Sequence, residues 1–219
     1  MKQINNDTKE MIELYLDAAK NLYGVIKLSK LLSIYNSQNE PISEEQFLDI
    51  IETIDCSRKH YDFVGEDEFY ENVDKVAPIE RDLVAEYILF DIEDDPSYYY
   101  ETKEEQIGKP YYIPEKAKLL KYADEFYYEK TLSFISLRAF FRNQPCLTKK
   151  QADELAEDIY SSANVYKTDL EAVINLTTYV FNFDDRTLDE FVPLYMDMFH
   201  DTRLHIHCGH TFNEIVKLI

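Results

Sequence analysis

The chain has 219 residues, a hydrophobic fraction of 45% and a formal net charge of −20 at pH 7. This length and composition are typical of a folded protein with one large domain or two small ones, and they exclude global disorder. The strong negative charge opposes binding to nucleic-acid phosphates and to anionic membrane surfaces.

The sequence lacks the usual signals of several classes of protein. Only four glycines are present, and no glycine-rich phosphate-binding motif occurs. The N-terminal MKQINNDTKEM has no apolar signal-peptide core, and no apolar run reaches the length of a membrane span. The three cysteines, Cys56, Cys146 and Cys208, are far apart, as expected of free thiols in a reducing compartment. We therefore expect a cytoplasmic protein.

The N-terminal part reads as helices around a very short strand. Apolar residues recur in helical period over 8–23, and Gly24 follows as a glycine often follows a helix. Residues 25–26 favour a short strand, and 28–36 a second helix.

A third helix is predicted from Ser43, because Gln46 three residues later completes a capping box. Two β-prone stretches around Gly65 then predict a hairpin over 58–73. This order of elements is that of a winged helix. The third helix, however, carries five acids and no base, which excludes the approach of that helix to phosphates; the acids are Glu44, Glu45, Asp49, Glu52 and Asp55.

Acidic residues are densest over 61–105, where sixteen acids face three basic residues. A helix is predicted over 81–92, and the following tyrosine-rich stretch reads as a connector. Two interpretations stay open: a solvated connector, or a surface that docks a basic protein or imitates nucleic acid. The candidate protein-binding residues are Glu66, Asp67, Glu68, Asp91, Glu93, Asp94, Asp95, Tyr98, Tyr99 and Tyr100.

The remaining sequence is helical in pattern. Helices are expected to open at Pro114, to run over 129–143, to open at a Thr148 capping box, and to cover 169–183 and 188–201.

The predicted fold class is therefore mostly α (α+β). A winged-helix-like unit with a small hairpin is expected to pack against a C-terminal helical bundle. The expected domains are the winged-helix-like part at 1–76, an acidic helix and tyrosine-rich connector at 77–110, and a helical domain at 111–219.

No sequence motif of a known catalytic site is present. G-x-S-x-G, H-E-x-x-H and C-x-x-C are all missing, and no histidine lies near Cys146 in the sequence to activate its thiol. We expect no enzyme activity, no catalytic residues and no cofactor.

The tail offers the one metal-like group, formed by His200, His205, His207, Cys208 and His210. Imidazole and thiolate suit zinc, but all of these candidates crowd into eleven residues, and His205 and His207 alternate as strand residues would. We expect no metal site.

A structural interpretation explains the rest of the tail. Thr211 and Glu214 form a capping box, which predicts a short terminal helix, and Gly209 provides the turn into it. Arg203 lies just before this turn, where it could pair with an acid. The apolar contacts that dock the helix are expected to come from Ile215, Val216 and Leu218.

Three stretches resemble one family of poorly characterised bacterial and phage-related proteins. TRLHIHCGHTFNEI (202–215) is similar to that family's TR-L-W…GHTPNEL pattern, which in longer members precedes a cysteine-rich SEC-C zinc motif. The stretches 23–51 and 109–131 resemble its IYN…IS-x-EEF and YYIP…KYAD…YYEKT patterns.

The resemblance implies a mostly helical protein with a winged-helix-like N-terminal part, and it implies no established activity. Phe212 replaces the family's proline, and no SEC-C cysteines follow the motif in this sequence, so no zinc-dependent role is implied. The tail histidines His205 and His207 fall at variable positions of the pattern.

We therefore expect a non-enzymatic protein-binding or regulatory protein of phage or mobile-element origin. Its partner is expected to be a protein, with a basic one favoured by the charge, and neither nucleic acid nor membrane is expected to bind directly. Two alternatives remain: an acidic nucleic-acid mimic that inhibits a nuclease or defence system, and a metal-dependent enzyme that uses the tail histidines.

Overall fold

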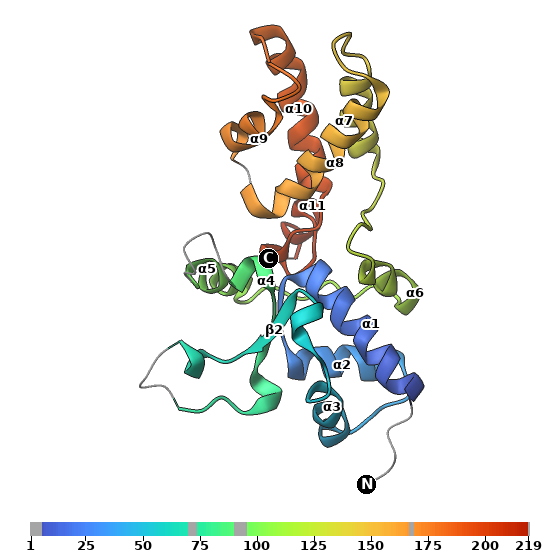
Figure 1. Cartoon of the computed structure of the whole chain (residues 1–219), viewed down its shortest axis with the longest axis vertical. Coiled ribbons are helices and arrows are strands. Elements are labelled where there is room, and N and C mark those ends of the chain that lie inside the picture. Colours follow the sequence, from blue (N-terminus) through green and yellow to red (C-terminus); the bar gives the residue numbers. More distant parts are fainter. Residues whose placement is uncertain (1–5, 70–73, 90–95, 167–168, 219) are drawn as a thin grey trace. The chain divides into compact units, whose positions relative to one another are not determined.

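The computed structural model describes residues 6–69, 74–89, 96–166 and 169–218 (Figure 1). The chain divides into two compact units, Met1–Tyr127 and Tyr128–Ile219. The predicted mostly α (α+β) class is confirmed, because helices dominate and the described part of the chain adds one small sheet of three strands. No helix among these residues is long and apolar enough to cross a membrane.

The first unit combines helices with the sheet. In chain order its helices and strands are α1 (Asn6–Tyr23), β1 (Val25–Lys27), α2 (Leu28–Gln38), α3 (Glu44–Ile51), β2 (Tyr61–Val64), β3 (Asp82–Ala85), α4 (Glu86–Leu89), α5 (Ser97–Gln106) and α6 (Lys116–Leu119). Single turns of 3-10 helix lie at Cys56–Arg58, Glu66–Glu68, Pro78–Glu80 and Leu120–Ala123.

The first three predicted helices and the short first strand are confirmed. Gly24 ends α1 with a positive φ of 66°, and its N–H donates to the Lys20 carbonyl (3.0 Å). Such a φ costs glycine little and other residues more, which is why glycine is favoured here. At α3 the predicted capping box is present, with Ser43 accepting from the Gln46 N–H.

The three strands form an antiparallel sheet in the order β1-β3-β2. Val84 of β3 pairs with Val25 on one side, and Leu83 pairs with Phe63 on the other. Successive side chains of a strand point to opposite faces. Leu83 accordingly packs into the core beside α1, α2 and α3, whereas Val84 packs into a smaller core with residues of α4 and α5.

Two sequence predictions in this region are met only in part. The hairpin expected over 58–73 extends into residues 70–73, which lie outside the described residues; before them, β2 pairs with β3 and the 3-10 turn Glu66–Glu68 follows Gly65. Of the helix predicted over 81–92, Glu86–Leu89 is helical as α4, whereas Asp82–Ala85 forms β3 and residues 90–92 lie outside the described residues. A short apolar run fits both periods, and here the pairing with two neighbouring strands decides for the strand.

The segment that follows α5 returns to α1. The Tyr23 hydroxyl donates to the Tyr112 carbonyl (2.7 Å), and the Asn21 amide donates to the Tyr122 carbonyl (2.7 Å). The side chains of Leu119 and Tyr122 belong to the same buried core as α1. The first unit therefore extends to Tyr127.

The stretch expected to be a connector, 77–110, is part of the first unit. Its α5 helix buries Tyr99 completely, and the Gln106 amide donates to the carbonyls of Tyr23 (3.1 Å) and Val25 (3.3 Å). The division of the chain thus falls after Tyr127, not at the expected positions near 76 and 110.

The second unit is helical. It contains α7 (Leu132–Arg142), α8 (Lys149–Tyr166), α9 (Leu170–Thr177), α10 (Asp185–Asp201) and α11 (Phe212–Ile215), with a 3-10 turn at His205–His207. α7, α8 and α10 pack together (Figure 1). The predicted Thr148 capping box is present: its hydroxyl accepts from the Gln151 N–H (3.3 Å), and its own N–H donates to the Gln151 side chain (3.0 Å).

Aromatic side chains form the centre of the second unit's core. Phe134, Phe141 and Phe191 are fully buried, and the rings of Phe141 and Phe191 lie 5.8 Å apart. Tyr195, one turn further along α10, stacks on Phe191 at 5.8 Å. Paired rings of this kind stabilise beyond the area that they bury.

We expect Phe191→Ala to destabilise the protein by about 3–5 kcal/mol, because it leaves a cavity among these rings. Leu132→Ala, at an α7 position that is 83% exposed, is the matched control and should change stability by less than about 0.5 kcal/mol. Urea unfolding monitored by circular dichroism measures both values. Equal losses for the two variants would show that the ring cluster is not the core.

Candidate functional site

Three of the acids predicted to bind a partner, Glu66, Asp67 and Glu68, are paired within the first unit. Glu66 binds the Lys103 ammonium of α5 (3.1 Å). Arg81, which directly precedes β3, pairs with Asp67 (3.6 Å) and forms a closer ion pair with Glu68. These three acids therefore fasten the turn after β2 to the sheet and to α5.

Tyr99, predicted as a contact residue, belongs to a buried polar network instead. Its hydroxyl donates to the Asp82 carboxylate (2.7 Å), which also accepts from Lys103 (2.9 Å). Burial and the Asp82 carboxylate raise the pKa of Tyr99. Burial alone would lower the pKa of Lys103, but Asp82 and the Tyr99 hydroxyl outweigh it and raise this pKa. The network keeps the buried Asp82 charge compensated.

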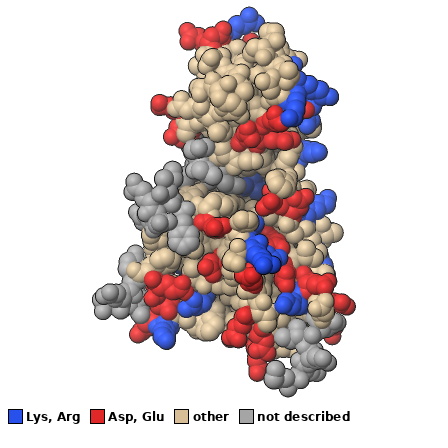
Figure 2. All heavy atoms as spheres, viewed as in Figure 1, with Lys and Arg blue, Asp and Glu red and all other residues tan. Residues whose placement is uncertain are grey.

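The other predicted contact residues are either partly buried or lie outside the part of the chain that the structure describes. Tyr98 and Tyr100 are half-buried, and the Tyr100 ring lies 5.0 Å from Tyr99 and 5.8 Å from Phe69. Asp91, Glu93, Asp94 and Asp95 lie outside the described residues. On the face shown in Figure 2, acidic side chains are spread over several elements with basic side chains among them.

Four acids without an ion pair lie close together on α3 and at its end. Glu44, Glu45 and Asp49 are exposed, as is Glu52 at the end of the helix, whereas Phe47 on the opposite face is buried. Within the described residues these four carboxylates form no ion pair. The acidic face thus lies on the helix whose charge already argued against nucleic-acid binding.

The tail histidines do not form a metal centre. Among the residues that the structure describes, no group of three or more His, Cys, Asp or Glu side chains is placed to hold a metal ion. His205 and His207 lie in a 3-10 turn, which corrects the expected strand-like alternation. The His200 ring stacks on Phe212 at 4.7 Å.

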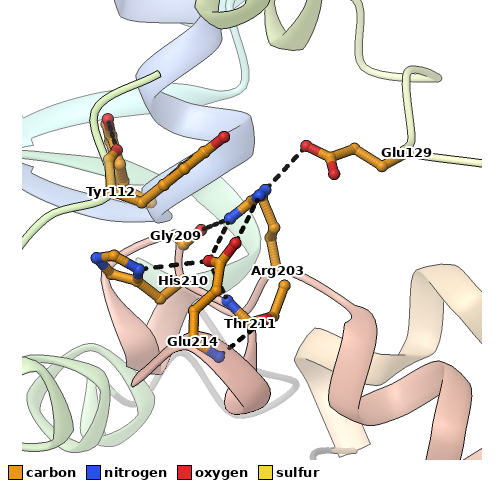
Figure 3. Close-up of polar contacts among 8 residues, drawn as sticks. Tyr112, Glu129, Arg203, Gly209, His210, Thr211 and Glu214 are labelled. Carbon is orange, nitrogen blue, oxygen red and sulfur yellow. Dashed lines mark hydrogen bonds and ion pairs between the residues drawn. The ribbon is translucent and has the colours of Figure 1, made fainter. Parts of the chain in front are cut away.

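The tail closes on itself around Arg203 (Figure 3). After α10, Cys208 and Gly209 adopt positive φ angles of 50° and 80°, and Arg203 forms an antiparallel bridge with Thr211. Thr211 caps α11 by accepting from the Glu214 N–H (3.2 Å), as predicted. A correction concerns the docking contacts of α11, which were expected from Ile215, Val216 and Leu218. Only Ile215 is buried.

The guanidinium of Arg203 is 8% exposed and holds three groups together. It donates to Glu129 (2.9 Å), to the Gly209 carbonyl (3.0 Å) and, in bidentate fashion, to Glu214 (2.8 and 3.2 Å). Such forked pairs with carboxylates are among the strongest hydrogen bonds in proteins. Arg203 thereby joins the segment before α7 to the tail, an arrangement that we call the tail latch.

A second polar bridge runs beside the tail latch. Asp201, the last residue of α10, accepts from the Ser133 hydroxyl at the start of α7 (2.8 Å) and from the Asn213 amide of α11 (2.9 Å). Two sets of polar contacts, those of Arg203 and those of Asp201, therefore connect the start of α7 with the end of α10 and with α11.

Two of the sequence stretches that carried the family resemblance meet at the tail latch. YYEKT contributes Glu129 and the Thr131 cap of α7, while TRLHIHCGHTFNEI contributes Arg203, Asn213 and Glu214.

Comparison of the chain with protein-family models, with curated proteins and with solved structures finds no match. The family resemblance of the three sequence stretches therefore stays a prediction.

Sequence reasoning foresaw only part of these sites. It predicted the Thr211 cap and an acidic partner for Arg203, but it did not identify Glu129, which lies 74 residues away in the sequence. Asp201 was missed as well, because a single acid at a helix end carries no local signal.

We expect Lys103→Met to cost about 2–3 kcal/mol of stability, because it leaves Asp82 buried without its cation. Replacing both residues, Lys103→Met with Asp82→Asn, should recover more than half of this loss. Lys150→Met, which removes an 86% exposed cation, is the control and should cost less than about 0.5 kcal/mol. Denaturant unfolding measures all three, and a double variant no more stable than Lys103→Met would contradict the buried pair.

Glu214→Gln should show a pH-dependent loss of stability. Partial burial would raise the pKa of Glu214, but hydrogen bonds from Arg203 and from the Thr211 backbone outweigh it and hold this pKa below its ordinary value of 4.5. Because folding lowers the pKa of Glu214, its ionised carboxylate stabilises the folded state fully at pH values above the unfolded-state pKa. This stabilisation is lost as the pH falls through the folded-state pKa.

Thermal unfolding from pH 7 to pH 3 checks this expectation. The parent should be more stable than the Glu214→Gln variant at neutral pH, and the difference should shrink as the solution becomes more acidic than the ordinary pKa of 4.5. Glu190→Gln, which breaks an exposed pair with Arg186, controls for the loss of a surface ion pair. A difference that grows on acidification would contradict the assigned sign.

Proposed function

We propose that the chain is a non-enzymatic protein-binding or regulatory protein whose first unit is a winged-helix-like module that binds a basic partner protein. The observation that carries the proposal is the unpaired acidic face of α3, at the position that a winged helix uses for recognition.

The order of elements supports the winged-helix part of the proposal. Helix, short strand, two helices and two further strands follow one another as α1, β1, α2, α3, β2 and β3. The third strand lies between the first two in the sheet. This is the order and strand arrangement expected of a winged helix.

The charge of α3 supports a protein partner. In nucleic-acid-binding proteins of the helix-turn-helix type, the recognition helix enters the major groove. Here that helix presents Glu44, Glu45, Asp49 and Glu52 to solvent without a cation among the described residues. Such a face repels phosphates and attracts a basic surface, which steers association and selects the partner.

The alternatives have less support. A nucleic-acid mimic built on 61–105 needs open acids there, and three of these acids, Glu66, Asp67 and Glu68, are paired with Lys103 and Arg81. No observation on the described residues favours a metal-dependent enzyme, and an origin in a phage or mobile element rests on the family resemblance alone.

A binding experiment with two charge-matched variants tests the proposal. The first carries Glu44→Gln, Glu45→Gln, Asp49→Asn and Glu52→Gln. The control carries Glu171→Gln, Asp185→Asn, Asp189→Asn and Asp197→Asn, which removes the same charge from exposed acids of the second unit. Each set includes two acids in the first turn of a helix, so the loss of helix-dipole stabilisation is matched.

The probes are a fluorescent helical peptide rich in lysine and leucine, and a labelled DNA duplex. Fluorescence anisotropy should show that the parent binds the peptide and that the α3 variant binds it about tenfold more weakly. The control variant should stay within about twofold, and binding should weaken as salt is added. Equal effects of the two variants, or binding of the duplex, would contradict the proposal.

A further inference from the structure

One side of α7 faces solvent and carries a row of apolar side chains. Leu132 is 83% exposed and Ile135 is 41% exposed, and Ala139 is exposed as well. These residues are three and four positions apart, so they lie along one face of the helix. The opposite face supplies Phe134 and Phe141 to the core. α7 therefore has a second apolar row, turned to solvent, which we call the α7 stripe.

Basic residues border the α7 stripe. Between Glu129 and Asp153 the sequence has five cations and no acid, although the whole chain has 43 acids and 23 cations. Arg138 and Arg142 each follow a residue of the stripe by three positions, so both lie along one edge of it. The five cations are Lys130, Arg138, Arg142, Lys149 and Lys150.

This positive charge is compensated only in part by the chain itself. Arg142 donates two hydrogen bonds to Asp153 of α8 (2.5 and 2.7 Å). These bonds, together with the charges of Arg142, Arg138 and Lys149, hold the pKa of Asp153 below its ordinary value of 3.8. Within the described residues, Lys130, Arg138 and Lys149 form no ion pair of their own. Positive charge is therefore in excess beside the stripe.

We propose that the α7 stripe docks an acidic amphipathic helix of a partner protein. The apolar side of that helix covers Leu132, Ile135 and Ala139, and its acids pair with Arg138 and Lys149. Recognition of this kind uses apolar anchors at helical spacing for affinity, and complementary charges along the edge select the partner. The stripe lies in the second unit, so this inference does not rest on the proposed binding face of α3.

Two other occupants of the stripe are disfavoured by charge. The α7 helix of a second copy brings two further arginines and no acid, because α7 contains neither Asp nor Glu. An anionic membrane attracts the cations of the stripe, but it repels a chain with a net charge of −20. Helices that lie on membranes also bury a broader apolar face than these three residues provide.

Fluorescence anisotropy of the full chain with two labelled peptides tests the docking site. The first is an amphipathic helical peptide rich in leucine and glutamate, and the second has the same composition in an order without an apolar face. The chain should bind the first peptide and should bind the second about tenfold more weakly. Equal binding of the two peptides, or no binding of the amphipathic one, would overturn the inference.

Two matched double variants locate the binding. Leu132→Ala with Ile135→Ala removes the large apolar side chains of the stripe and should weaken binding of the amphipathic peptide about tenfold. Leu14→Ala with Ile107→Ala removes the same residue types from first-unit positions that are 40% and 77% exposed. This control should keep its affinity within about twofold of the parent's. Equal weakening in both variants would show that the peptide does not bind at the stripe.

A second pair of variants tests the charges. Arg138→Gln with Lys149→Gln should weaken binding about fivefold and reduce its dependence on salt. Arg186→Gln with Lys217→Gln, which removes the same residue types from exposed positions of the same unit, is the control and should change neither. Binding that is insensitive to both variants would contradict the role of the charges.

The other occupants are tested with the same apolar variant. Parent and Leu132→Ala/Ile135→Ala chains are compared for binding to vesicles that contain anionic phospholipid, and for self-association by analytical ultracentrifugation. The proposal expects the parent to show neither activity through the stripe. Vesicle binding or self-association that the double substitution abolishes would assign the stripe to a membrane or to a second copy, and would overturn the proposal.

Discussion

The guanidinium of Arg203 is buried in the second unit and therefore needs carboxylate partners. A charged group that is withdrawn from water destabilises the fold unless ion pairs and hydrogen bonds replace its hydration. Arg203 obtains them from Glu129, Glu214 and the Gly209 carbonyl, which come from opposite ends of the unit's sequence. The segment before α7, the turn after α10 and the short α11 therefore each contribute a partner of this one side chain.

The same constraint explains why the acidic, tyrosine-rich stretch of the first unit is structured. Asp82 is buried at the start of the central strand, and its charge is compensated by Lys103, with Tyr99 donating to it. Both partners lie on α5, so burial of this carboxylate holds α5 against the sheet. A sequence with sixteen acids over 61–105 reads as a solvated connector, yet two of its three cations, Arg81 and Lys103, each pair with two acids of that stretch.

Local sequence signals were sufficient to predict many helices and caps. They did not identify the distant residues that contact them. The caps at Ser43, Thr148 and Thr211 involve residues three apart, so the sequence predicted each of them correctly. The strand β3 was predicted as a helix because the short apolar run Leu83–Ala85 fits both periods, and only pairing with β1 and β2 distinguishes them. Contacts such as Arg203 with Glu129 depend on the fold as a whole and carry no local pattern.

Some acids of this chain are paired with its own cations and stabilise the fold, whereas others have no such partner and can attract another molecule. Where an acid meets a cation of its own chain, as Glu66 meets Lys103, a partner protein could bind it only by displacing that cation. The acids of α3 have no such competitor among the described residues, and the buried Phe47, Ile50 and Ile51 fix the helix so that these acids point outward together. A net charge of −20 therefore does not describe one uniform surface. In the proposed binding of a basic partner, the carboxylates that the fold leaves uncompensated contribute most, because they retain their full attraction for a cation.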